Sequence, residues 1–148
     1  MASGRASGPT EHSPPGECRM TLMHPSSGEP CRVLVLDDEP LILLDLEFAV
    51  EDAGCEPLTA LDLGEALSIV QSTAISAAIL DVSLGQGQTC EQVARTLAGM
   101  GIPYVLHTGD LDRMDEGVRK LGGTLVPKPT PAAVVVARAL EPLAARTA

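Results

Sequence analysis

Acidic side chains follow two short apolar runs of this 148-residue chain. Asp37 and Asp38 come directly after the run 33–36, and Asp81 follows the run 77–80. Such runs are too short for helices and are typical of strands buried on both faces of a parallel sheet. Because parallel strands end at one edge of the sheet, the carboxylates should meet there, where they repel one another unless a cation is bound. Carboxylate oxygens suit Mg²⁺, so the sequence predicts a magnesium site.

A hydroxyl and an ammonium group follow two further runs of the same type. Thr108 follows the run 104–107, and Lys128 follows the run 124–127. Beside a metal-bound carboxylate, these two groups are suited to hold the oxygens of an incoming phosphoryl group. The combined set predicts that one of the carboxylates accepts a phosphoryl group.

The apolar runs alternate with patterns of helical spacing. This alternation is typical of an α/β fold with helices on both faces of a parallel sheet. Strands are expected at 33–36, 56–60, 77–80, 104–107 and 124–127, and helices at 40–53, 62–72, 89–100, 110–121 and from 130 onward.

Two prolines indicate the order of the strands. Pro57 and Pro127 lack the N–H that a central strand donates to its neighbour, so the second and fifth strands should form the edges of the sheet. The doubly wound, flavodoxin-like order 2-1-3-4-5 satisfies this requirement and brings the ends of the first and third strands side by side. We therefore expect Asp37, Asp38 and Asp81 in one pocket, with Thr108 and Lys128 on its other flank.

Helical spacing also predicts which side chains face the core and where helices begin. In the first helix, Leu41, Leu44 and Phe48, with Ile42, Ala49 and Ala53 beside them, are expected to form a wide apolar face, and Gly54 to end the helix. The expected N-caps of later helices are Asp62 with Glu65, Thr89 with Gln92, and Thr130 before Pro131. The later helices are expected to pack Met100, Val134, Val135 and Leu140.

Four motifs, VLVLDDEP, AAILD, VLHTGD and VPKP, occur in this order, and together they resemble the receiver domain of two-component response regulators over roughly residues 31–148. The resemblance implies that Asp81 is the phosphoacceptor, that Asp38 ligates Mg²⁺ directly and that Asp37 acts largely through metal-bound water. It further implies the backbone carbonyl of Ser83 as a metal ligand.

The same resemblance implies roles for the later motifs. Thr108 would be the switch hydroxyl, Gly109 the small neighbour that leaves room for it, and Lys128 the partner of the phosphoryl group, followed by a cis peptide bond to Pro129. Two positions depart from the family pattern. Leu125 stands where an aromatic residue is usual, and Gly85 stands where the family commonly has proline.

Composition narrows the classes of function. The formal net charge of −10 argues against direct binding to nucleic acids and to anionic membranes, because both need clustered cations. No apolar stretch has the length of a signal peptide or a membrane span, so a cytoplasmic location is the expectation. The first 30 residues are rich in Ser, Gly and Pro and are expected to form a flexible tail before the domain 31–148.

The cysteines and histidines suggest no further chemistry from sequence alone. Cys18, Cys31, Cys55 and Cys90 are widely spaced without a Cys-x-x-Cys pair, so neither a zinc site nor a redox dithiol is indicated. His107 lies inside an apolar strand and is interpreted as a core residue with satisfied hydrogen bonds.

The favoured interpretation is a stand-alone receiver that accepts a phosphoryl group from a sensor histidine kinase or phosphotransfer protein and hydrolyses it slowly, with no other dedicated enzyme activity. Such a receiver would act either by contacting a downstream protein or as a phosphate sink. Alternatives are a partner-binding pseudo-receiver and a phosphohydrolase, although the latter usually has a second acid where Ser83 stands. The expected output face, on the fourth helix, fifth strand and fifth helix, comprises Arg113, Glu116, Arg119, Lys120, Leu125 and Arg138.

Overall fold

The computed structural model describes residues 30–109, 120 and 122–147. Its elements are β1 (Arg32–Leu36), α1 (Pro40–Asp52), β2 (Glu56–Ala60), α2 (Leu63–Ser72), β3 (Ala77–Asp81), α3 (Glu91–Gly99), β4 (Tyr104–Thr108), β5 (Thr124–Pro127) and α5 (Ala132–Thr147). The helix expected at 110–121 and the tail expected at 1–30 fall almost wholly outside the described residues.

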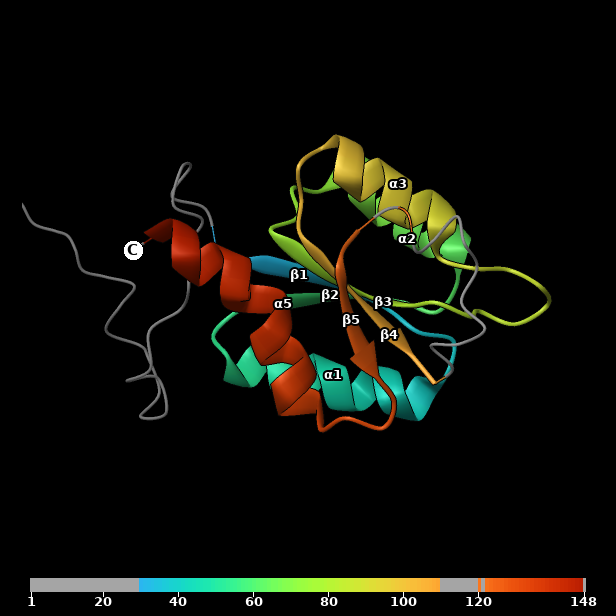
Figure 1. Ribbon diagram of the computed structural model, residues 1–148, viewed down its shortest axis with the longest axis horizontal. Helices are drawn as coiled ribbons and strands as arrows, with labels where there is room; N and C mark the ends of the chain where they lie inside the picture. Colours follow the sequence, from blue (N-terminus) through green and yellow to red (C-terminus); the bar gives the residue numbers. More distant parts are fainter. Residues whose placement is uncertain (1–29, 110–119, 121, 148) are drawn as a thin grey trace, which may run out of the picture.

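The five strands form one parallel sheet in the order β2-β1-β3-β4-β5, as predicted (Figure 1). Pro57 lies in the edge strand β2, where it pairs in register with Val33, and Pro127 lies in the opposite edge strand, β5. The missing N–H of each proline is therefore tolerated at an edge. The sheet brings the carboxyl ends of β1 and β3 next to each other, which sets up the pocket.

Helices cover both faces of the sheet, with α1 and α5 on one face and α2 and α3 on the other (Figure 1). Successive side chains of a strand point to opposite faces. In β1, for example, Val33 and Val35 pack in the core under α1 and α5, whereas Leu34 and Leu36 pack in the core under α2 and α3. The central strands are therefore apolar throughout because both of their faces are buried.

The predicted apolar face of α1 is only partly correct: Ile42, Ala49 and Ala53 pack against the core, but its three largest side chains do not. Leu41, Leu44 and Phe48 are 80%, 44% and 55% exposed, and the helix instead buries Leu43, Leu46 and Val50 against the sheet. The helix carries apolar residues on nearly all sides, so spacing alone did not identify the side that packs. The outcome is an exposed apolar stripe on α1 that begins beside the acidic pocket.

Two other residues expected in the core are largely exposed. Met100, after the end of α3, is 54% exposed, and Val134 in α5 is 46% exposed. α5 buries Val135 and Leu140, as predicted, together with Val136.

The predicted N-caps have three different outcomes. The cap of α2 is confirmed, since Asp62 Oδ1 accepts a hydrogen bond from the Glu65 N–H at 2.8 Å. The cap of α3 is Cys90 rather than Thr89, whose hydroxyl accepts from the Glu91 N–H at 3.3 Å. The Thr130 hydroxyl donates to the carbonyl of Pro127 instead of capping α5, and the carbonyl of Pro131 accepts the first helical bonds.

Within the described residues, no helix is both long enough and apolar enough to span a bilayer.

Candidate functional site

Four of the predicted functional residues stand at the carboxyl ends of strands. Asp37 follows β1, Asp81 ends β3, Thr108 ends β4 and Lys128 follows β5. One carboxylate oxygen from each of Asp37, Asp38 and Asp81 lies within 4.8 Å of those of the other two. The structure therefore gathers at one edge of the sheet the three acids that the sequence predicts together.

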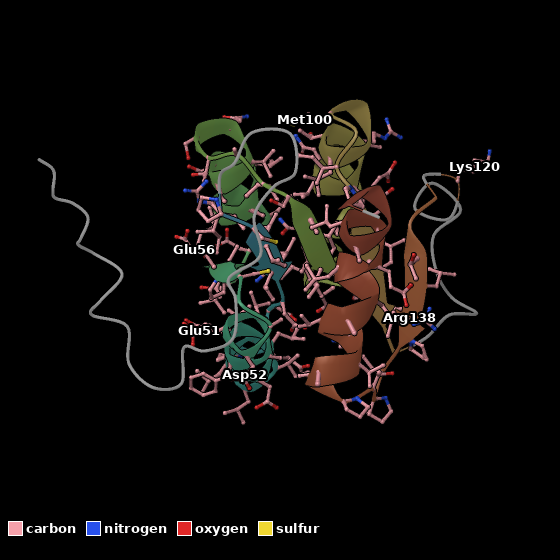
Figure 2. The ribbon with its side chains drawn as sticks, turned by 90° about the vertical axis from the view of Figure 1, so that its left-hand side faces the viewer. Glu51, Asp52, Glu56, Met100, Lys120 and Arg138 are labelled. Carbon is pink, nitrogen blue, oxygen red and sulfur yellow. The ribbon has the colours of Figure 1, made fainter. Side chains whose placement is uncertain are left out.

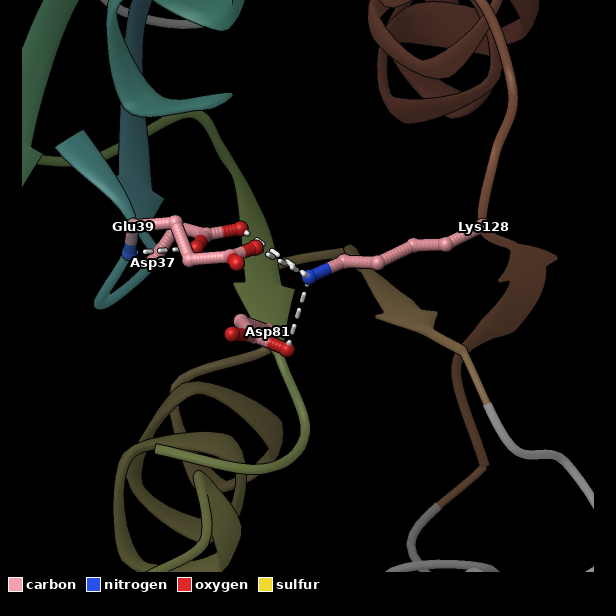
Figure 3. Close-up of polar contacts among 4 residues, drawn as sticks. All are labelled: Asp37, Glu39, Asp81 and Lys128. Atoms are coloured by element: carbon pink, nitrogen blue, oxygen red, sulfur yellow. Dashed lines mark hydrogen bonds and ion pairs between the residues drawn. The ribbon is translucent and has the colours of Figure 1, made fainter. Parts of the chain in front are cut away.

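Lys128 connects the acids across the site (Figure 3). Its Nζ atom lies 3.3 Å from Asp81 Oδ1 and 3.4 Å from Asp37 Oδ2. Glu39 is a third and weaker partner, with its Oε1 atom 3.9 Å from the same nitrogen. Lys128 thus supplies the counter-charge for two buried carboxylates, a role that fits the expected position beside a phosphoryl group.

Glu39 stands in the same acidic run, but it is not among the predicted site residues. Its backbone N–H donates to Asp37 Oδ1 at 2.9 Å, which fixes the orientation of the Asp37 carboxylate. Its own side chain is 61% exposed, so its attraction to Lys128 is weakened by solvent. Glu39 therefore positions Asp37 through its backbone more than it contributes charge.

Burial has a large effect on the acidity of Asp81. Its side chain is 6% exposed. Desolvation raises the pKa of Asp81 to about 7, and the charge of Asp37 adds to the rise, while Lys128 opposes it. Burial alone would lower the pKa of Lys128, but the carboxylates of Asp81 and Asp37 outweigh burial and raise it. Lys128 thus stays charged at neutral pH, when Asp81 is only partly ionised.

The loop after β3 passes close to Asp38. Ser83 pairs with Thr89 in a short antiparallel bridge, and the Val82 N–H donates to the carbonyl of His107 at 3.2 Å. Gly85 has a φ of +81°, and a Cβ atom there would lie 3.3 Å from Asp38 Oδ2. A glycine at this position therefore lets the loop lie against a predicted metal ligand.

Thr108 and the loop after β5 complete the site. Thr108 is 5% exposed, and its carbonyl accepts a hydrogen bond from the Lys128 N–H at 2.8 Å. A Cβ atom at Gly109 would approach no described side chain closer than Lys128 Cβ, at 4.0 Å, so there is room beside Thr108. The peptide bond between Lys128 and Pro129 is cis, as the family resemblance implies.

His107 differs from expectation. It is 4% exposed, but neither ring nitrogen has a hydrogen-bond partner among the described residues, so the predicted satisfied hydrogen bonds are not found there. The imidazole lines a cavity between α1 and the loop that precedes α5. Burial lowers the pKa of His107, and the charge of Lys128 lowers it further.

The donor atoms fit a hard divalent cation. All three clustered side chains offer carboxylate oxygens, and no described histidine or cysteine joins them. Oxygen-only donor sets of this kind suit Mg²⁺, which keeps several of its waters, better than they suit zinc. Asp37 and Asp81 are buried and Asp38 is exposed, so such a cation would be reached from the Asp38 side.

No protein-family model and no curated protein matches the sequence. Solved structures do match. A response regulator receiver protein from Sinorhizobium medicae is 24% identical with a TM-score of 0.68, covering 78% of this chain and 96% of that chain. A CheY-like receiver domain protein from Methanospirillum hungatei is 20% identical with a TM-score of 0.69, over 79% and 96%.

SdrG from Sphingomonas melonis is 36% identical to this chain, with a TM-score of 0.64 over 77% of this chain and 96% of that chain. This identity accompanies the receiver fold and the acid pocket with its lysine at the carboxyl edge of the sheet. The chain therefore belongs to the family of response regulator receiver domains.

Proposed function

We propose that this chain accepts a phosphoryl group on Asp81 from a sensor histidine kinase or a phosphotransfer protein. One observation carries the proposal: buried Asp81 lies beside Asp37, Asp38 and the ammonium group of Lys128 at one edge of the sheet. A nucleophile, a cation site and a fixed positive charge are the three requirements of phosphoryl transfer to a carboxylate.

The transfer uses the ionised form of Asp81. One of its oxygens forms a bond to phosphorus while the phosphorus–nitrogen bond to the donor histidine breaks, and the histidine nitrogen takes a proton. Lys128 and the Thr108 hydroxyl hold phosphoryl oxygens. Asp37, Asp38, Asp81 and the carbonyl of Ser83 would hold Mg²⁺, which would supply neutralisation of the phosphoryl charge. Water later hydrolyses the acyl phosphate.

The output proposal concerns the face that carries β5 and α5. Among its described members, Lys120 and Arg138 are exposed and Leu125 is 40% exposed. Figure 2 shows the two cations on the side of β5 and α5, and Glu51, Asp52 and Glu56 on the side of α1 and β2. This separation of charge favours a downstream protein with an acidic contact surface. Arg113, Glu116 and Arg119 lie outside the described residues.

Leu125 shapes how this face responds. Because no aromatic ring stands at this position, ring rotation cannot report the state of Thr108. The response then rests on movement of backbone and of neighbouring elements. We further propose that the protein acts in the cytoplasm as a single-domain regulator, either through this face or as a phosphate sink.

Incubation with a small phosphodonor and Mg²⁺ tests the primary proposal. One base-labile adduct on Asp81, absent from Asp81→Asn, is expected. An adduct of equal yield in Asp81→Asn would refute the assignment, and no adduct under any condition would favour a pseudo-receiver. Steady turnover of many equivalents of an unrelated phosphate ester would favour a phosphohydrolase instead.

The output proposal needs a separate measurement. Proteins captured by the phosphorylated chain are compared with those captured by Lys120→Glu/Arg138→Glu, which should lose partner binding and keep Asp81 phosphorylation. A double variant on the opposite side, Glu51→Lys/Asp52→Lys, is the control. Equal capture by phosphorylated and unphosphorylated parent would leave the phosphate sink as the function.

A further inference from the structure

Two cysteines lie side by side at the amino-terminal end of the sheet. Cys31 directly precedes β1 and Cys55 directly precedes β2. Arg32 pairs with Glu56 in parallel register, so the cysteines form the next pair outward. The Glu56 N–H donates to the carbonyl of Cys31 at 2.9 Å, which ties the two backbones together at this point.

Both thiols point into the same layer of the core. Cys31 is 1% exposed and Cys55 6% exposed, and both belong to the cluster under α1 and α5. The two thiols therefore lie in the same part of the core, on neighbouring strands that are joined at this point by a backbone hydrogen bond.

The backbone spacing suits a covalent bond between them. Neighbouring strands lie about 4.8 Å apart, and disulfides join Cα atoms separated by about 4.4 to 6.8 Å. Registered residues of parallel strands also direct their side chains to the same face. A disulfide at this position needs rotation of the two side chains and a small approach of the strands, since its Cβ atoms lie about 3.5 to 4.5 Å apart.

We propose that Cys31 and Cys55 form a reversible redox pair that a hydroperoxide oxidises to an intramolecular disulfide. Nothing in the phosphorylation proposal is required for this pair, which lies at the opposite end of the sheet. Transient disulfides of this kind are known uses of cysteine pairs in reducing compartments.

The two thiols are suited to different steps. The hydrogen bond from Cys55 lowers the pKa of Cys31, with burial opposing it, whereas the same contact and burial raise the pKa of Cys55. We assign the first reaction with oxidant to Cys31 and the resolving step to Cys55.

The chemistry balances with peroxide alone. The Cys31 thiolate attacks a peroxide oxygen, the O–O bond breaks, and the departing hydroxide takes the thiol proton to become water. Cys55 sulfur then attacks the sulfenic sulfur of Cys31, the S–O bond breaks, and a second water leaves with the Cys55 proton. Two thiols are oxidised to one disulfide, and one hydrogen peroxide is reduced to two waters.

Access to the pair depends on the edge strand. β2 has a neighbour on one side only, so its start opens more readily than that of a central strand. Hydrogen peroxide is small enough to use such openings. Cys90, by contrast, is fully buried in the other core cluster, where no second cysteine lies among the described residues, and burial raises its pKa to about 12.

The test uses the full chain treated with hydrogen peroxide, then unfolded and alkylated. Two of the four thiols should resist alkylation, peptide mapping should find one Cys31–Cys55 cross-link, and dithiothreitol should restore both thiols. The cross-link should raise the melting temperature by on the order of 5 to 10 °C. The proposal would be overturned if Cys31 and Cys55 were both fully alkylated after oxidation, or if they were cross-linked only to Cys18.

Variants separate this pair from other sulfur chemistry. Cys18→Ser and Cys90→Ser should keep the cross-link and the thermal shift, whereas Cys31→Ser and Cys55→Ser should lose both while keeping the parent's circular dichroism. Asp81→Asn should form the disulfide as the parent does, so the two proposals can fail independently. Peptide mapping of the oxidised parent protein tests for the Cys31–Cys55 cross-link even if a cysteine variant does not fold.

Discussion

The Nζ atom of Lys128 lies 3.3 Å from Oδ1 of Asp81, and this ion pair links the turn after β5 to the end of β3 across the intervening β4. The side chain of Lys128 thus reaches across the site from the β5 side. Its attraction does not outweigh burial, because the pKa of Asp81 still rises to about 7. Before any divalent cation binds, the pocket holds more negative charge than its lysine can neutralise.

The raised pKa of Asp81 makes the stability of the metal-free protein depend on pH. The folded form binds more protons than the unfolded form between the ordinary pKa of 3.8 and about 7, so the free energy of unfolding falls as pH rises through this window. Urea unfolding should give higher stability at pH 5 than at pH 8, by on the order of 1 to 3 kcal/mol. Asp81→Asn should remove this difference. The same pH dependence in both proteins would contradict the assignment.

Mg²⁺ should stabilise the parent at neutral pH, because a cation that binds only the folded state adds stability by mass action. Asp38→Ala should lose the increase in melting temperature that Mg²⁺ produces. Asp52→Ala, which removes an exposed carboxylate at the end of α1, should keep it. Removal of residues 1–27 should also leave it unchanged. A full Mg²⁺ effect in Asp38→Ala would exclude this carboxylate as a ligand.

Gly85 and Gly87 form a matched pair for testing the loop after β3. Both have positive φ, +81° and +75°, so alanine at either should cost about 1 kcal/mol of stability. Only at Gly85 would the added Cβ contact Asp38 Oδ2, whereas nothing lies within 4 Å at Gly87. Gly85→Ala should therefore weaken Mg²⁺ binding several-fold in a titration, and Gly87→Ala should not. Equal weakening in both would indicate a general effect of loop strain.

The orientation of α1 can be tested with two leucines. Leu46 is 2% exposed and Leu44 is 44% exposed. Leu46→Ala should lower the free energy of unfolding by about 2 to 4 kcal/mol, and Leu44→Ala by less than about 1 kcal/mol. Chemical denaturation measures both. A larger loss for Leu44→Ala would restore the helix face that spacing predicts.

The site residues whose positions were predicted correctly are those that directly follow or end a strand. In a parallel sheet, the residue after each strand must lie at the carboxyl edge, and Pro57 and Pro127 assigned the edges. The positions of Asp37, Asp81, Thr108 and Lys128 therefore followed without any knowledge of packing.

Features that depend on packing were less predictable. α1 is apolar on several sides, so its buried face depends on contacts with β1 and α5 that no local pattern encodes. Cys31 and Cys55 are far apart in sequence and match no cysteine motif. The available signal was that each directly precedes a strand and that those two strands are neighbours.

The length of β1 has a consequence for how the two ends of the sheet act on one another. Asp37 lies six positions after Cys31, which in an extended strand is on the order of 20 Å. At an effective dielectric constant of about 20, two unit charges this far apart interact by less than about 1 kcal/mol. The electrostatic interaction between the thiols and the acids is therefore weak. Any influence of one end on the other is transmitted mainly as a shift of the strand itself.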